Sequence, residues 1–245
     1  MKRGIANLIC AFVPGRTRRH YLRTRLMFDV KKYIEFARHD AKMPNADAKI
    51  YLGFSSTRRL IVVLDNKIAY KIPLRDSLAD VPAREKLFTD AFRDASPIRL
   101  PRASVVNATI DGKKYNVLKY DFIGGTPVGK LSHETLDKYS DKIAAQLAGF
   151  LYAVGQSNPK SIAHLKPRGA KPGFMYGWTQ NDIGGNFLVD EKTGKITGVI
   201  DWENAAFCDM TTDLLAAHKF LSAIGGGQII PKTIIEYGKL YSENK

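Results

Sequence analysis

A change in residue pattern after residue 122 constrains the fold of this chain more than any other feature. Residues 47–122 contain short runs rich in β-branched and aromatic residues, separated by turn residues, with one helical stretch among them. The expected strands are 49–54, 59–64, 67–74, 100–106 and 115–122, and the expected helix is 81–95, with Pro82 in its first turn. The first three strands follow one another through short turns and predict an antiparallel meander.

The second half of the chain has a helical pattern. A helix is expected from an N-cap at Ser132 to about residue 155, with Glu134 in its first turn. Two more are expected at 212–223 and 231–241, and a hairpin joins 187–189 to 196–200; residues 156–178 indicate an extended loop. These patterns predict an α+β fold with a basic N-terminal segment (1–46), a β-rich domain (47–122) and a mostly helical domain (123–245).

The densest chemistry lies around the expected hairpin. Asp182 precedes it, Asn186 stands at its entrance and Asp201 at its exit. The hairpin would bring Asn186 and Asp201 side by side. Phosphoryl transfer from ATP uses these residue types, because one carboxylate orients or deprotonates the attacking hydroxyl while an amide oxygen and another carboxylate hold magnesium.

The segment TQNDIGGNFLVDEKTGKITGVIDWE resembles the catalytic stretch of the aminoglycoside-phosphotransferase and choline-kinase-like enzymes, relatives of protein kinases. In that family, H-[GN]-D-x-x-x-x-N-[IF]-L-V-D is followed by a hairpin and V-I-D-[WF]-E. The resemblance implies a protein-kinase-like two-lobed fold and the cofactors ATP and Mg²⁺. It also implies that Asp182 is the catalytic acid and that Asn186 and Asp201 are magnesium ligands.

The resemblance extends less distinctly over residues 48–223. Lys71 falls where the family has its phosphate-binding, catalytically required lysine, and Glu85 on the next helix is its expected ion-pair partner. Residues 117–121 are similar to the hinge that receives adenine, which makes Lys119 and Asp121 candidate nucleotide-binding residues. The turn over the phosphates would contain Gly53, Ser55 and Ser56, although the segment has only one glycine. Asp209 and Asp213 are expected to fix the backbone around the catalytic loop, and Trp202 and Phe207 to lie in the core.

Two departures from the family pattern bear on activity. Gln180 replaces the usual histidine, which mainly supports the loop, so the change is expected to be tolerated. Only three residues separate Asp182 from Asn186, where the family usually has four. We favour a deletion in the loop, since the order Asn-Asp-Ile is common in the family. In the alternative register Asn181 takes the place of the acid, which would indicate a weakened or inactive enzyme.

The net charge of +14 is concentrated near the N-terminus, where residues 2–32 hold nine basic residues against one acid, Asp29. The apolar stretch 5–13 is too short to span a bilayer, and no small-x-small cleavage site follows it. Two interpretations stay open. Residues 1–32 contact an anionic membrane through their basic residues and through apolar side chains, or they form a helix packed on its own domain. The apolar contacts in the first case are Phe12, Tyr21, Leu22, Leu26 and Phe28.

Composition limits the remaining classes. Two cysteines and five scattered histidines predict neither a disulfide framework nor a zinc motif, which favours a reducing, cytoplasmic location, with peripheral contact at the inner membrane face as a further expectation. No nucleic-acid-binding motif accompanies the charge, so no nucleic-acid partner is expected.

The short stretch after Asp201 suits a large acceptor. An opening loosely similar to that of proteins encoded with bacterial surface-polysaccharide genes favours a hydroxyl on lipopolysaccharide or another cell-surface glycan. A choline- or aminoglycoside-type acceptor, and a catalytically silent kinase-like binding module, stay open.

Overall fold

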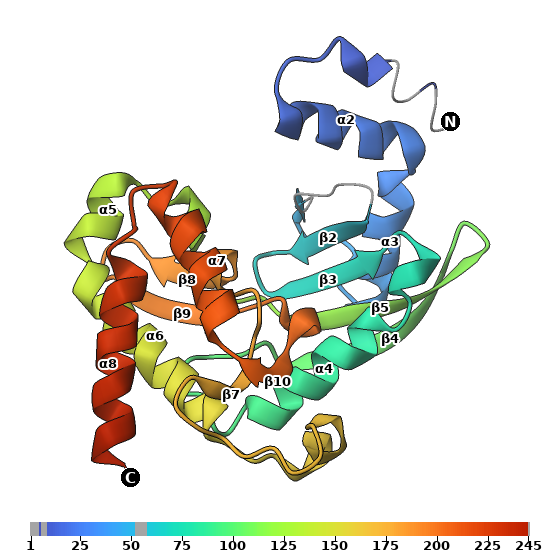
Figure 1. Cartoon of the computed structure of the whole chain (residues 1–245). Coiled ribbons are helices and arrows are strands. Elements are labelled where there is room, and N and C mark those ends of the chain that lie inside the picture. The colour runs from blue at the N-terminus through green and yellow to red at the C-terminus, as the bar shows by residue number, and fades with distance from the viewer. Residues whose placement is uncertain (1–4, 6–8, 52–57, 245) are drawn as a thin grey trace. The chain divides into compact units, whose positions relative to one another are not determined.

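The computed structural model describes residues 9–51 and 58–244 together with Ile5 (Figure 1). The chain forms two compact units. Unit 1 comprises residues 1–86 and 103–122, and unit 2 comprises residues 87–102 and 123–245. One division between the units follows Phe122, the position of the expected domain boundary. Residues 1–46, expected as a separate segment, lie within unit 1, and residues 87–102 leave the β-rich part and join the core of unit 2.

Unit 1 is built on a five-stranded antiparallel sheet in the order β1-β2-β3-β5-β4. Its strands are β1 (Ala48–Tyr51), β2 (Arg59–Leu64), β3 (Ile68–Pro73), β4 (Ala103–Ile110) and β5 (Lys113–Asp121). The predicted meander is confirmed by the β1–β2–β3 pairing. Central strands β2 and β3 are buried along most of their length; β2 is apolar after Arg59, and Lys71 is the one charged residue of β3.

Helix α3 (Val30–Asp40) covers one face of this sheet. It begins after Asp29, whose carboxylate accepts a hydrogen bond from Lys31 N at 3.2 Å. Val30, Tyr33 and Ala37 are buried at helical spacing, and the Tyr33 hydroxyl lies 3.1 Å from that of Tyr115 on β5. This part of the N-terminal segment therefore follows the packed-helix interpretation. The preceding helix α2 (Arg16–Met27) exposes the side chains of two of its arginines, at positions 18 and 19.

Unit 2 contains most of the helices, as the sequence predicts. These are α5 (His133–Lys138), α6 (Ser140–Gly155), α7 (Thr211–Ser222) and α8 (Ile229–Glu243), and helix α4 (Val81–Phe92) enters this unit at Leu87. The Ser132 cap is confirmed, because its hydroxyl accepts from Thr135 N at 3.1 Å. The single helix expected over 132–155 was wrong: at Tyr139 φ is −108°, and the chain there divides it into α5 and α6. Helices α6 and α8 lie side by side (Figure 1).

Unit 2 has two small sheets, and one of them contains the expected catalytic hairpin. The hairpin is confirmed as β8 (Phe187–Asp190) paired with β9 (Lys195–Val199), and β6 (Thr126–Pro127) adds to β8. The expectation of a loop through residue 178 was wrong at its end, because β7 (Tyr176–Thr179) pairs there with β10 (Ala206–Asp209). These strands are too short for a clear alternation of residues. A Cβ at Gly177 would lie 2.2 Å from Gly155 O, so the close approach of β7 to α6 requires glycine.

The strand expected at 100–106 was also wrong in its bounds, since β4 begins at Ala103. Pro101 has no backbone N–H to donate to a ladder. Ile98 and Leu100 are instead buried in the core of unit 2, and Arg99 O accepts from Val199 N at 3.2 Å. Helix α4 ends at Phe92, three residues before the expected end. Among the described residues, every helix is too short or too polar to cross a bilayer.

Candidate active site

In unit 1, Lys71 and Glu85 form a buried ion pair. Lys71 Nζ lies 2.6 Å from Glu85 Oε2, and the two residues are only 6% and 2% exposed. Lys71 lies in the middle of β3 between Ile61 of β2 and Leu118 of β5, while Glu85 lies one turn into α4. A charged pair this deeply buried is costly to desolvate, and removing either partner would be strongly destabilising. The pairing expected from the sequence is therefore present.

Two of the candidate nucleotide residues lie on β5. The ammonium of Lys119 lies 2.7 Å from Asp40 Oδ2 and over the ring of Tyr70, whose hydroxyl donates to the same carboxylate oxygen at 2.7 Å. Tyr70 and Lys71 are successive strand residues and point to opposite faces of the sheet, so the Lys119 side chain lies on the face away from Lys71. These contacts give Lys119 a structural connection to α3.

The other candidates of unit 1 stay predictions. Asp121 is exposed at the end of β5, paired across the ladder with Ile68. Gly53, Ser55 and Ser56, which the sequence places over the nucleotide phosphates, lie outside the described residues.

In unit 2, the catalytic loop follows β7 and is closed by Asn186. Asn186 Nδ2 donates to Asp182 O at 2.8 Å, and Asn186 N donates to Ile183 O at 3.2 Å. The backbone oxygen of Asn186 in turn accepts from Ile200 N at 2.8 Å. The loop is thereby joined to the chain just before Asp201, and the structure brings the entrance and exit of the hairpin together as the sequence predicts.

The side chain of Gln180 connects the loop with the residue at the hairpin exit. It is fully buried, and its Nε2 donates to Ile200 O at 3.1 Å and to Asp201 O at 2.6 Å. Its Oε1 accepts from Asp182 N at 2.8 Å. One neutral amide therefore positions the backbones of both acids. The sequence indicated only that the replacement of histidine by Gln180 is tolerable. The three hydrogen bonds of the Gln180 amide were not predicted, because they depend on the three-dimensional positions of their partners.

Asp213 anchors the loop from α7. Its Oδ1 accepts from Ile183 N at 3.0 Å and its Oδ2 accepts from the Thr179 hydroxyl at 3.1 Å. Burial raises the pKa of the Asp213 carboxyl, and the hydrogen bonds from Ile183 and Thr179 oppose that rise. The expected structural role of Asp213 is thus present. Asp209 likewise accepts from Thr211 N and from the Thr211 hydroxyl, at the start of α7.

Asp182 has the electrostatic setting of a group that can take a proton. Although the residue is exposed, partial burial of its carboxyl raises its pKa, and the negative charges of Asp201 and Glu203 raise it further; a hydrogen bond from Asn186 opposes them. Asn181 adopts a left-handed backbone (φ 62°) and donates from its side chain to Asn204 O at 3.3 Å. Asp182 is thus the loop residue whose carboxyl is affected by the charges of Asp201 and Glu203, and the deletion register stays a prediction.

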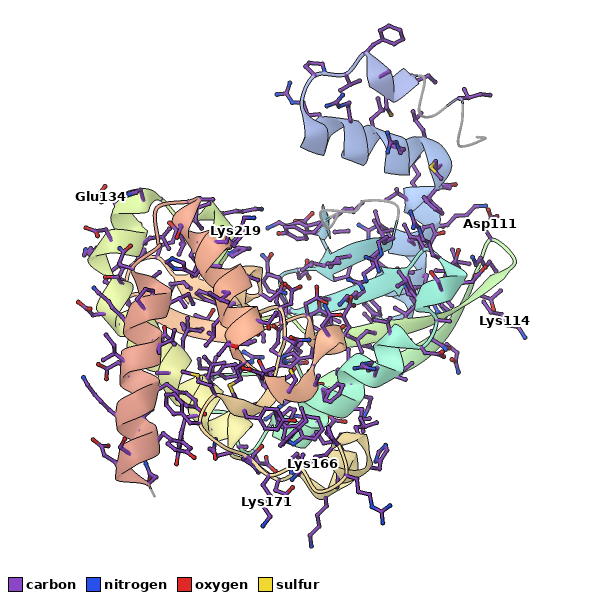
Figure 2. All side chains as sticks on the ribbon, in the orientation of Figure 1. Asp111, Lys114, Glu134, Lys166, Lys171 and Lys219 are labelled. Atoms are coloured by element: carbon purple, nitrogen blue, oxygen red, sulfur yellow. The ribbon has the colours of Figure 1, made fainter. Side chains whose placement is uncertain are left out.

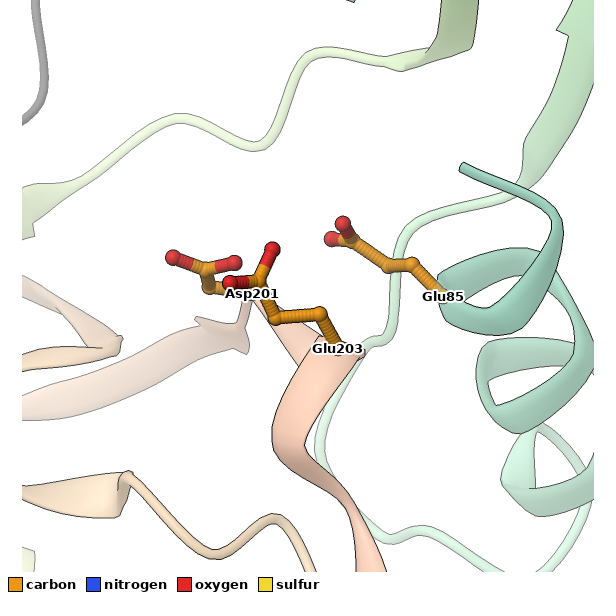
Figure 3. Close-up of side chains that lie close together, drawn as sticks. All are labelled: Glu85, Asp201 and Glu203. Atoms are coloured by element: carbon orange, nitrogen blue, oxygen red, sulfur yellow. The ribbon is translucent and has the colours of Figure 1, made fainter. Parts of the chain in front are cut away.

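Asp201 and Glu203 project from the short segment after β9 (Figure 3). Carboxylate oxygens of the two lie within 4.8 Å of each other. Asp201 has φ 63°, a left-handed conformation that costs a non-glycine residue energy. Trp202 between them is fully buried, and its indole donates to Val199 O at 3.2 Å. Glu203 was not singled out from the sequence, although the family pattern V-I-D-[WF]-E contains it.

Comparisons with known proteins agree with this geometry. The profile of the "Phosphotransferase enzyme family" matches residues 183–243, a region that includes Asn186 and Asp201 and begins directly after Asp182. The predicted resemblance is therefore confirmed over that region. None of the curated proteins matches the chain.

Solved aminoglycoside phosphotransferases share the fold. The streptomycin–ATP ternary complex of APH(2")-IIa has a TM-score of 0.63 at 14% identity, covering 83% of each chain. ADP-bound APH(2")-Ib has a TM-score of 0.60 at 15% identity, covering 89% of this chain and 86% of the other. APH(3")-Id from Streptomyces rimosus has a TM-score of 0.58 at 12% identity, covering 86% and 92%. The predicted α+β, kinase-like fold is thus confirmed.

Proposed function

We propose that this protein is an ATP-dependent phosphotransferase that moves the γ-phosphate of ATP to a hydroxyl of its acceptor. The observation that carries the proposal is Asp182, whose pKa is raised by partial burial and by the charges of Asp201 and Glu203, and which directly precedes the region matched by the phosphotransferase profile. The acceptor oxygen forms a bond to the γ-phosphorus as its proton passes to the Asp182 carboxylate, and the bond from phosphorus to the β–γ bridging oxygen breaks, so that ADP leaves.

The side chains at the hairpin fit a magnesium ion. Mg²⁺ takes oxygen ligands, and the amide of Asn186 uses its nitrogen to donate to Asp182 O, which directs the remaining amide oxygen to other partners. The carboxylates of Asp201 and Glu203 lie close enough to share one cation. Asn186 and Asp201 would hold the ion, with Glu203 as an additional acid. When bound, the ion would supply positive charge against the phosphates of ATP.

Lys71 and Glu85 would contribute to nucleotide binding. A lysine held in one position by a buried carboxylate presents a fixed positive charge, and fixed charges stabilise phosphates without reorganisation at the moment of transfer. Glu85 therefore acts through Lys71 as a positioning residue. Solved proteins of the same fold, including one in complex with ATP and one with ADP, support a nucleotide as the ligand of this pair.

For the acceptor, we favour a hydroxyl on lipopolysaccharide or another anionic cell-surface glycan. The net charge of +14 suits an anionic partner. The N-terminal segment supports contact with an anionic membrane, because Phe12 is 84%, Ile5 51% and Ile9 42% exposed, and Arg18 and Arg19 are exposed on α2. An aminoglycoside-like soluble acceptor is the alternative within the same reaction, since neighbours of this fold are bound to streptomycin and gentamicin.

A second candidate function is a kinase-like binding module without transfer activity. The three-residue spacing between Asp182 and Asn186 favours it, because a shortened loop can displace the acid from the acceptor. The two candidates differ in one measurable property, the appearance of phosphorylated acceptor.

The test is transfer of label from [γ-³²P]ATP to membrane glycolipid fractions and to a panel of soluble sugars and amino alcohols. The wild type should label at least one acceptor, and Asp182→Asn should abolish the label while retaining nucleotide binding. Asp137→Asn is a matched control, since Asp137 is exposed on α5 and its oxygen would still accept from Gln228. Equal labelling by wild type and Asp182→Asn would refute the proposal, and nucleotide binding without any labelled acceptor would favour the binding module.

A further inference from the structure

The catalytic loop of unit 2 lies along one face of helix α7. The three loop residues Ile183, Gly184 and Gly185 form a single turn of 3-10 helix. The α7 residues that contact them are spaced by four and then three positions, which places them on one side of the helix: Asp213, Ala217 and Phe220. Each loop residue therefore meets a different turn of α7.

The contact at Gly184 leaves no room for a side chain. A Cβ at Gly184 would lie 2.7 Å from the Cα of Ala217 and 3.2 Å from its Cβ. The nearest atom belongs to the backbone of α7, so it cannot rotate away as the end of a side chain could. The φ of Gly184 is not positive, and glycine is therefore required there by space rather than by backbone conformation. Ala217 is buried beneath the loop.

Phe220 extends the same contact by one helical turn. Its ring lies 3.9 Å from the position of a Cβ at Gly185, and a Cβ at Gly129 would come within 2.9 Å of the ring. Gly129 belongs to the short helical turn Val128–Lys130, which follows β6, the strand that pairs with β8 of the hairpin. Phe220 therefore contacts both the loop and the segment beside the hairpin.

This packing concerns the residue that the loop lacks. The family usually has four residues between the acid and the asparagine, and this chain has three. The first loop residue, Ile183, is held on α7 by Asp213, and the loop is closed by the hydrogen bond from Asn186 Nδ2 to Asp182 O. Between these fixed ends the shorter backbone lies directly on the helix, which needs a glycine in the loop and a small residue beneath it. The backbone on the C-terminal side of Asp182 is thereby fixed by α7.

We infer that the contact between Gly184 and Ala217 compensates for the shorter loop and positions Asp182 for transfer. Ala217 is a positioning residue, because it is buried and acts through the loop backbone. This role rests on the proposed function and deepens it, since it opposes the displacement of the acid that a shortened loop would otherwise allow. The four-residue spacing of the family would then not suit this chain.

The test enlarges the residue beneath the loop. Ala217→Val should lower the kcat of label transfer by about ten- to a hundredfold, the scale on which a displacement of about 1 Å lowers a rate, and should leave the KM for ATP nearly unchanged. Ala216→Val is the matched control and should alter neither, because it makes the same change on the exposed side of α7, where Lys219 also lies (Figure 2). Gly184→Ala changes the loop and leaves α7 intact, so it should act as Ala217→Val does even if that variant folds poorly; far-UV circular dichroism verifies each fold.

Amide hydrogen exchange tests the loop without any transfer. The Ile183 amide donates to Asp213, and in Ala217→Val it should exchange about tenfold faster or more than in Ala216→Val, the scale set by one lost hydrogen bond. Exchange of the Leu147 amide, within α6, reports any loss of stability of the whole unit, so the ratio of the two rates isolates the loop. A wild type without transfer activity would refute the proposed function, and this ratio would still decide the role of Ala217.

A glycine inserted after Gly185 restores the four-residue spacing of the family. It should lower kcat, because the longer loop no longer matches α7, whereas an acid displaced by the deletion would gain activity from the same insertion. A raised kcat in the insertion variant overturns the inference. So does a ratio of Ile183 to Leu147 exchange that is the same in Ala217→Val and Ala216→Val.

Discussion

The side-chain nitrogen of Gln180 donates to the backbone oxygen of Asp201 at 2.6 Å, across twenty residues of sequence. The same amide accepts from the backbone of Asp182. The geometry of the acid and of the hairpin exit is therefore fixed by one buried neutral side chain, which a histidine could reproduce only in part, because a neutral imidazole has one donor and one acceptor.

Gln180→Leu should lower both stability and turnover. It leaves Asp182 N–H and two carbonyl oxygens without this partner, at about 1–3 kcal/mol for each buried group that stays unsatisfied. Gln180→His should retain part of the activity, while Gln180→Glu should fail like leucine, since a carboxylate cannot donate to carbonyls. Thermal unfolding and steady-state turnover of the three variants provide the comparison. Full activity in Gln180→Leu would show that the amide does not position the acids.

The carboxyl of Asp182 should titrate above the ordinary aspartate range in the metal-free protein, because burial and two acidic neighbours oppose its ionisation. Glu203→Gln removes one negative neighbour and should lower that pKa, and added Mg²⁺ should lower it as well. The Asp182 carboxylate is available as a base only above its pKa, so the fraction able to accept a proton falls as pH decreases through that value. Carbon-13 NMR of labelled aspartate measures the titration; a pKa unaffected by Glu203→Gln would contradict the electrostatic account.

Lys71→Met should weaken ATP binding and destabilise unit 1. Breaking a buried ion pair costs about 3–5 kcal/mol, because the remaining charge is left without its partner. The double variant Lys71→Met/Glu85→Gln should regain stability without regaining ATP affinity. This split between chemical denaturation and nucleotide binding distinguishes phosphate binding from a purely structural pair. Unchanged ATP affinity in Lys71→Met would remove the lysine from the site.

Arg18→Gln/Arg19→Gln should reduce binding of the full-length chain to anionic vesicles. Each basic residue near such a surface contributes about 1 kcal/mol, so the pair corresponds to roughly a thirtyfold loss. High salt should weaken the wild type in the same way. Co-sedimentation with vesicles of phosphatidylglycerol, with Lys192→Gln/Lys195→Gln as control, gives the readout. Equal binding by both double variants would contradict the membrane contact and indicate that α2 is a solvated helix.

The sequence predicted those parts of the fold that depend on local pattern. The meander β1–β3, the hairpin β8–β9 and the Ser132 cap follow from residue type and spacing over a few positions. Strands β7 and β10 were missed, because four-residue strands that pair across about thirty residues have no periodic signal of their own. The displacement of residues 98–100 into the core of unit 2 also depends on tertiary packing.

Within the candidate site, residue identity was predictable and residue geometry was not. The family resemblance implied the pair of Lys71 and Glu85, and the expected hairpin predicted that Asn186 lies beside the hairpin exit. The side chain of Lys119 lies toward α3, since the alternation of β5 places it beside Tyr70 and Asp40. The contact of Lys119 with Asp40 was not predictable, because the sequence left open whether the N-terminal segment packs on its own domain.

Asp201 keeps a backbone conformation that glycine would adopt at no cost. A side chain there costs roughly 1 kcal/mol or more, so Asp201→Gly should raise the melting temperature while removing the carboxylate. Selection for heat resistance alone, applied to a random library of this gene, would therefore enrich glycine at 201 and lose phosphotransfer. Persistence of an acid at this position would report selection for chemistry at the expense of stability.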